Sequence, residues 1–150
     1  MKTYDNLAAY AADKGKDIGA SDWFEIDQKR IQDFAEATGD FQWIHLDAER
    51  TQKELNMPTI AHGYLTLSLL PKLSSEISAI KSVTRGINYG ANRLRFTGMV
   101  PSGSRVRLRS KLLNVEDKAG GKLFTSEVTM EVEGQDRPAL VAETLSLLYE

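Results

Sequence analysis

The residues best suited to chemistry lie in one short region of the chain. The sequence contains two histidines, His45 and His62, and Asp40 precedes His45 by five residues. A carboxylate and an imidazole that flank one pocket can hold a water molecule between them and share the removal and return of its proton. The pair therefore predicts general acid/base chemistry. Spacing alone leaves two alternatives open. Asp40 could instead cap a turn, and His45 could cap a helix or fill a place in the core.

Gly63 adds a second element, because it follows His62 at the expected start of an apolar helix. A glycine in the first helical turn leaves its backbone N–H unobstructed, and that donor suits an oxyanion developing on a carbonyl. Close backbone packing is the alternative interpretation of Gly63, and capping or loop placement that of His62. Two histidines and one aspartate without further ligand side chains do not predict a metal site. We expect no metal and no cofactor.

Composition limits the possible classes of protein. A length of 150 residues predicts a single domain over residues 1–150. The absence of cysteine excludes a thiol nucleophile and agrees with a cytoplasmic location. The net charge of −2 gives no general attraction to nucleic acid. No apolar run approaches the roughly 20 residues of a membrane span, and the N-terminus lacks the apolar core of a signal peptide.

Two short helices are expected to frame the Asp40/His45 pair. Asp27 is a predicted N-cap, apolar residues follow at spacings of three and four, and Gly39 is a predicted stop. Asp40 then lies just past a helix end, in a segment expected to be an irregular loop. Asp47 is expected to cap a second helix over residues 48–55.

A longer third helix should begin near His62 and Gly63 and continue to Ile77. Because it carries scarcely a charge, we expect it to be buried on nearly all sides. Residues 4–16 are typical of a helix or turn that ends at Gly19, and residues 22–26 of a strand.

From Thr84 onward the hydrophobic period changes to two, as in antiparallel strands with one covered face. Residues 105–112 and 124–132 alternate in this way, Asp117–Gly121 is typical of a hairpin turn, and the last strand is expected over residues 140–149. The order of elements predicts an α+β fold in which a curved antiparallel sheet wraps the apolar helix.

A cluster of basic residues is concentrated in the second half of the chain. Its members are Arg93, Arg95, Arg105, Arg107, Arg109 and Lys111. The solvated faces of strands account for them more simply, and a phosphate-binding patch is the sharper alternative.

The stretch Phe34–His45 followed by Ile60–Gly63 resembles the hydratase signature of MaoC-like dehydratases and (R)-specific enoyl-CoA hydratases. The later stretches Ile87–Phe96 and Val100–Arg105 are similar to the nodulation protein N-like branch of that family. The similarity runs from about residue 18 to the C-terminus, and its two-part signature is specific.

The resemblance implies a hot-dog fold, a homodimer whose sheets join edge to edge, and acyl tunnels near the interface. It implies hydration of trans-2-enoyl-CoA to (3R)-hydroxyacyl-CoA, or the reverse, in fatty acid metabolism. Asp40 and His45 would be the catalytic pair, and Gly63 would donate its N–H to the thioester oxygen.

Where the commonest signature has asparagine and proline, this chain has Gln42 and Trp43. The Gln42 amide can still brace the loop by hydrogen bonds. The candidate substrate-binding residues are His62, Tyr64, Asn88, Arg93, Arg95 and Arg105. A hot-dog thioesterase and a non-catalytic acyl-CoA-binding subunit remain the alternative functions.

Overall fold

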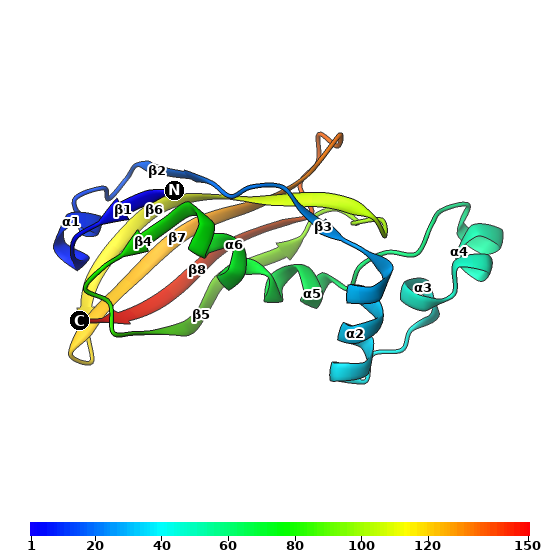
Figure 1. Cartoon of the computed structure of the whole chain (residues 1–150), viewed down its shortest axis with the longest axis horizontal. Coiled ribbons are helices and arrows are strands. Elements are labelled where there is room, and N and C mark those ends of the chain that lie inside the picture. Colours follow the sequence, from blue (N-terminus) through cyan, green and yellow to red (C-terminus); the bar gives the residue numbers. More distant parts are fainter.

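The computed structural model describes residues 1–150 and is built around a strongly curved antiparallel sheet (Figure 1). The strand order is β2-β6-β7-β8-β5, and β3 also pairs with β6. Their bounds are Asp17–Ala20 (β2), Phe24–Ile26 (β3), Arg85–Phe96 (β5), Ser104–Lys118 (β6), Gly121–Val132 (β7) and Leu140–Tyr149 (β8). A separate parallel pair joins β1 (Lys2–Tyr4) to β4 (Ser78–Ile80).

The predicted alternation along β6 is confirmed. Val106, Leu108 and Leu112 are fully buried, whereas Arg105 and Arg109 are exposed on the opposite face. One face of the sheet therefore forms the core, as expected for period-two patterning.

The hairpin turn predicted over Asp117–Gly121 is also confirmed between β6 and β7, although Gly121, the second of its two consecutive glycines, has no positive φ. The positive φ values belong to Ala119 (49°) and Gly120 (80°). Gly121 has a different role, because a Cβ there would lie 2.5 Å from the carbonyl oxygen of Leu148.

The central helix is interrupted, so the prediction of one continuous helix was wrong. It consists of α5 (Gly63–Ser68) and α6 (Leu70–Ile77), with Pro71 in the first turn of α6. Proline lacks the N–H that would continue the hydrogen-bond ladder, but it is well accommodated at a helix start.

The prediction that this helix is buried on nearly all sides was also wrong. Leu73 and Ile77 of α6 pack into the core beneath the sheet, whereas Tyr64 of α5 is 66% exposed. A curved sheet around a central helical segment nevertheless confirms the predicted α+β architecture and the hot-dog arrangement (Figure 1).

Both short helices begin and end where their caps predict. In α2 (Gln28–Thr38), Asp27 accepts the N–H of Arg30, and Gly39 ends the helix with a φ of 78°. In α4 (Ala48–Leu55), Asp47 is the N-cap and Asn56 ends the helix in the left-handed conformation. These helices lie beyond one end of the sheet (Figure 1).

Two other local predictions were inaccurate. The segment between Asp40 and His45 is not wholly irregular, because Trp43–Leu46 forms the one-turn helix α3. At the N-terminus only Leu7–Ala11 is helical (α1), because the flanking residues pair as β1 and β2 with strands distant in sequence.

No helix of the structure has the length and apolar character needed to cross a lipid bilayer.

Candidate active site

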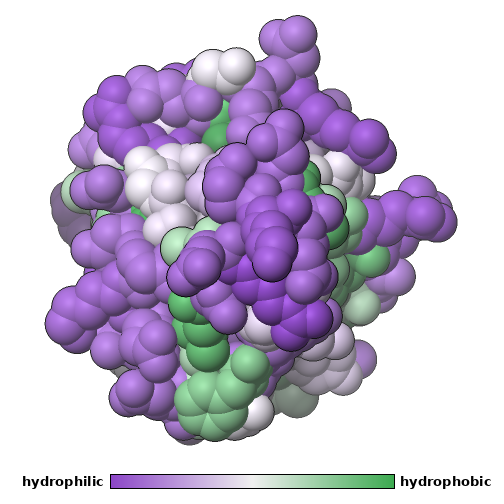
Figure 2. All heavy atoms as spheres, turned by 90° about the vertical axis from the view of Figure 1, so that its right-hand side faces the viewer, coloured by the Kyte–Doolittle hydropathy of each residue, from purple (hydrophilic) through white to green (hydrophobic).

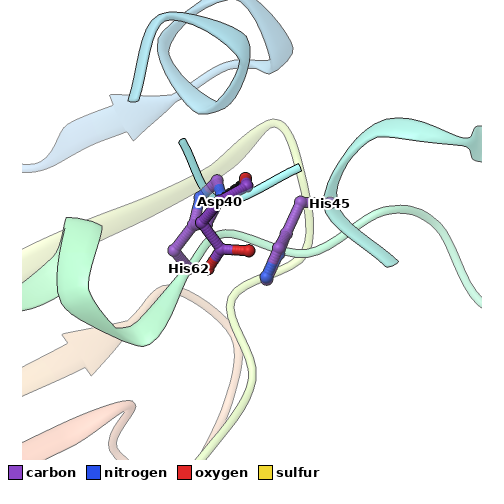
Figure 3. Close-up of side chains that lie close together, drawn as sticks. All are labelled: Asp40, His45 and His62. Atoms are coloured by element: carbon purple, nitrogen blue, oxygen red, sulfur yellow. Dashed lines mark hydrogen bonds between the residues drawn. The ribbon is translucent and has the colours of Figure 1, made fainter. Parts of the chain in front are cut away.

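Asp40, His45 and His62 meet where α2, α3 and the start of α5 come together. One potential ligand atom from each residue lies within 4.8 Å of those of the other two. Asp40 follows the end of α2, His45 belongs to α3, and His62 immediately precedes α5. The carboxylate of Asp40 points into the space beside the ring of His45 (Figure 3).

The surroundings of His45 determine its tautomer. The residue is 6% exposed, and its Nδ1 lies 2.7 Å from the carbonyl oxygen of Ile60. Because a carbonyl can only accept, Nδ1 carries the proton and Nε2 keeps its lone pair. Burial lowers the pKa of His45 below its ordinary value of 6.5, against the opposing effects of the Ile60 carbonyl and of Asp40. His45 is thus placed to accept a proton at Nε2.

His62 is 2% exposed and contacts both of the other residues. Its Nε2 donates to the main-chain carbonyl of Asp40 at 3.1 Å. Its ring stacks on that of His45 with centroids 3.8 Å apart, and the ring of Phe34 lies 4.9 Å away. This burial argues against the predicted contact of His62 with substrate.

Asp40 is the most exposed of the three residues, and its Oδ1 accepts the backbone N–H of Gln42 at 3.3 Å. The prediction that the Gln42 amide braces the loop was wrong, since that side chain is exposed and makes no hydrogen bond. Gln42 contributes through its main chain instead. Its carbonyl accepts the N–H of His45 at 3.1 Å.

The side-chain amide that does brace this region is that of Gln28, which sequence reasoning missed. It donates to the main-chain carbonyl of His45 at 2.8 Å and accepts the hydroxyl of Thr59 at 2.6 Å. Hydrogen bonds between residues so distant in sequence leave no periodic signal. Only the position of Gln28 directly after the Asp27 cap could have drawn attention to it.

A cavity of about 390 Å³ opens beside His45, and Gly63 lines it together with mostly apolar residues. The other lining residues are Ile44, Ile60, Ala61, Thr66, Phe96, Thr97, Gly98, Met99, Val100 and Ala139. A Cβ on Gly63 would lie 3.0 Å from the ring of Phe96, so this position leaves no room for a side chain without a shift of that ring. The N–H of Gly63 makes no hydrogen bond within the chain.

The three-residue cluster is poorly arranged to hold a metal ion. One nitrogen of each histidine is already bonded to a main-chain carbonyl. The remaining nitrogens belong to rings stacked at an interplanar angle of 25°. Imidazole lone pairs lie in the ring plane, and those of stacked rings do not converge on one ion.

The other predicted substrate-binding residues lie outside this cavity. Tyr64 is exposed and packs edge-on against Phe96, which does line it. Asn88 lines separate cavities between β5 and α6. Arg93 and Arg95 are exposed on β5.

Arg105 forms a two-pronged ion pair with Glu133, and Arg107 and Arg109 share Glu131. These pairs favour the solvated-face interpretation for the three arginines of β6. The face over α2, α3 and α4 is likewise mostly hydrophilic, with hydrophobic atoms gathered toward its lower part (Figure 2).

Known proteins resemble this chain over most of its length. The family model described as "MaoC like domain" matches residues 10–134. The chain is 47% identical to 3-hydroxyacyl-thioester dehydratase Z of Mycobacterium tuberculosis, over 97% of each chain. It is 42% identical to nodulation protein N of Rhizobium leguminosarum bv. viciae, over 95% of this chain and 91% of that protein.

Among solved structures, the (R)-hydratase from A. caviae involved in PHA biosynthesis superposes with a TM-score of 0.74 at 20% identity. That match covers 91% of this chain and 96% of the other. The family model and the identity to the dehydratase both extend over most of the chain, and the chain therefore belongs to the MaoC-like family.

Proposed function

We propose that this chain is an (R)-specific enoyl-CoA hydratase, a hydro-lyase that adds water reversibly to trans-2-enoyl-CoA to give (3R)-hydroxyacyl-CoA. The observation that carries the proposal is His45, which lines a largely apolar cavity, keeps its Nε2 free and has a potential ligand atom within 4.8 Å of one of Asp40. The names of the dehydratase relative and of the (R)-hydratase that shares the fold support the same reaction class.

In the proposed mechanism, a water molecule is held between Asp40 and His45. Nε2 of His45 takes one proton from this water as its oxygen bonds to C3 of the enoyl group. The same nitrogen returns the proton to C2 on the same face, so that water adds in the syn sense. Asp40 orients the water and stabilises the transient imidazolium.

Gly63 completes the proposed active site. Its unpaired N–H would donate to the thioester oxygen, which gains negative charge as the enolate-like state develops. The apolar lining would exclude bulk water and thereby strengthen this interaction. No metal or cofactor enters the proposed reaction.

Crotonyl-CoA hydration tests the proposal. We expect loss of the absorbance of the conjugated double bond and, on chiral analysis, a (3R)-hydroxy product. A panel of longer enoyl-CoA substrates would then define the chain-length preference. Release of free thiol, measured with a thiol-reactive dye, would indicate a thioesterase instead. Ligand binding with neither signal would indicate a non-catalytic acyl-CoA-binding subunit.

The same proposal includes a homodimer of two single-domain chains, each spanning residues 1–150. The long edge strand β5 hydrogen-bonds only to β8, and it exposes Ile87, Tyr89 and Phe96. A long exposed edge with apolar side chains favours pairing with another strand. Sedimentation equilibrium should give twice the chain mass, and Ile87→Lys should shift the population toward monomer. A cytoplasmic location, testable by cell fractionation, is also part of the proposal.

A further inference from the structure

We propose that Gln28 is a positioning residue that holds His45 in its reactive orientation. This inference rests on the function proposed above, in which His45 acts on a water molecule. The Gln28 amide bridges two segments that are distant in sequence. Its Nε2 donates to the main-chain carbonyl of His45 at 2.8 Å, and its Oε1 accepts the Thr59 hydroxyl at 2.6 Å.

His45 needs such support because α3 contains only four residues. A helix of one turn is far too short to be stable by itself in water. The last carbonyls of a helix also lack intrahelical partners, and the carbonyl of His45 is one of them. Gln28 supplies the missing donor and ties the turn that carries His45 to the longer helix α2.

The orientation of the Gln28 amide follows from its partners. The carbonyl of His45 can only accept, so the NH₂ group must face it, and Oε1 must face Thr59. Thr59 is itself fixed, since it is 3% exposed and its carbonyl accepts the N–H of Ser102 at 2.8 Å.

These contacts close a ring of hydrogen bonds around His45. Thr59 precedes Ile60, whose carbonyl accepts Nδ1–H of the His45 ring and whose N–H donates to the carbonyl of Ile44 at 3.1 Å. The main chain and the imidazole of His45 are therefore held by neighbouring residues of one segment. The bond from Nδ1–H to Ile60 leaves Nε2 unprotonated. This set of hydrogen bonds therefore also maintains the tautomer that the proposed reaction requires.

Gln28 also relates His45 to Asp40. It is the first residue of α2, and Asp40 follows two residues after the last, Thr38. An eleven-residue helix is a rigid spacer about 16 Å long. One element thus holds His45 through its first residue and presents Asp40 just beyond its last.

The kinetic test compares Gln28→Met, Thr59→Val and their double variant in crotonyl-CoA hydration. Gln32→Met is the matched control, because Gln32 lies one turn further along α2 and its amide bonds only Glu36. We expect Gln28→Met to lower kcat by about ten- to a hundredfold with little change in KM, the scale of a misplaced catalytic group. The double variant should be no worse than the worse single variant, since both break one linked set of bonds.

Thr59→Ser keeps the hydroxyl, so its kcat should stay close to wild type, in contrast to that of Thr59→Val. This comparison tests the same linked bonds if Gln28→Met fails to fold. The ¹⁵N shifts of the His45 ring should move away from the Nδ1–H form in Gln28→Met and stay unchanged in Gln32→Met. A folded Gln28→Met with wild-type kcat and unchanged shifts would overturn the inference. A wild-type chain without hydratase activity would instead overturn the proposed function, and the ring shifts would still decide the role of Gln28.

Discussion

The imidazole rings of His45 and His62 stack with their centroids 3.8 Å apart, and each donates one N–H to a main-chain carbonyl. The chemical environments of the two rings nevertheless differ. His45 borders the cavity, whereas Nδ1 of His62 is buried without a partner. The difference in surroundings favours His45 for the proposed proton transfer and leaves His62 a supporting position.

Removal of either member of the proposed catalytic pair should abolish most of the turnover. We expect Asp40→Asn and His45→Gln each to lower kcat for crotonyl-CoA by about a hundredfold or more, the usual scale of general acid/base catalysis. Asp33→Asn is the matched control, because the Asp33 carboxylate is exposed on α2 and pairs only with Lys29. Circular dichroism should show that all variants are folded. Wild-type turnover in either site variant would refute the proposed pair.

The pH dependence should reflect the lowered pKa of His45. The proposed mechanism requires the neutral ring, so the acid limb of kcat/KM should fall below pH 6.5. The unfolded chain takes up a proton at this histidine below pH 6.5, where the native chain does not. Stability should therefore decrease as pH falls from 6.5 toward the native pKa.

Melting temperatures and kcat/KM measured from about pH 5 to about pH 8 would check both expectations. His45→Gln lacks the titrating group and serves as the reference for the stability profile. An acid limb centred above pH 6.5, or a His45→Gln profile that parallels wild type throughout, would contradict the assignment.

Two properties of Gly63, its free N–H and its lack of a side chain, can be tested separately. Gly63→Ala keeps the N–H but places a Cβ about 3.0 Å from the Phe96 ring, so it reports the steric effect alone. Gly63→Pro places a Cβ at the same position and replaces the N–H by a ring carbon, at a first helical position that accepts proline. We expect kcat to be about a hundredfold lower in Gly63→Pro than in Gly63→Ala, as for loss of one oxyanion donor. Equal kcat values in two folded variants would remove Gly63 from the oxyanion role.

The arginines of β5 and β6 should differ in their effect on substrate affinity. Arg93→Ala and Arg95→Ala should raise KM for enoyl-CoA several-fold with kcat little changed, if these exposed side chains meet the CoA phosphates. Arg105→Ala is the control, because its guanidinium is already paired with Glu133. An unaltered KM in the β5 variants would leave them as solvated surface residues.

Local signals in the sequence were sufficient to predict much of the framework. Asp27 and Gly39 determine the ends of α2 through a side-chain cap and a left-handed residue, which involve only neighbouring atoms. The alternation along β6 likewise predicts which face is buried, because every second side chain points to the same side. Pro71 carried an equally local signal for the break between α5 and α6.

The arrangement of the site depended on the tertiary structure. The residue types at Asp40, His45 and Gly63 suggest acid/base chemistry, but spacing alone does not show which nitrogen of His45 is free. That property follows from the bond of Nδ1 to Ile60, 15 residues away along the chain, while Gln28, 17 residues away, holds the main chain of His45. Such contacts form only when separate elements pack together, and they follow no periodicity. The sequence therefore determined the kinds of reactive groups, and the packing of α2, α3 and the Thr59–Ile60 segment decided their tautomer and orientation.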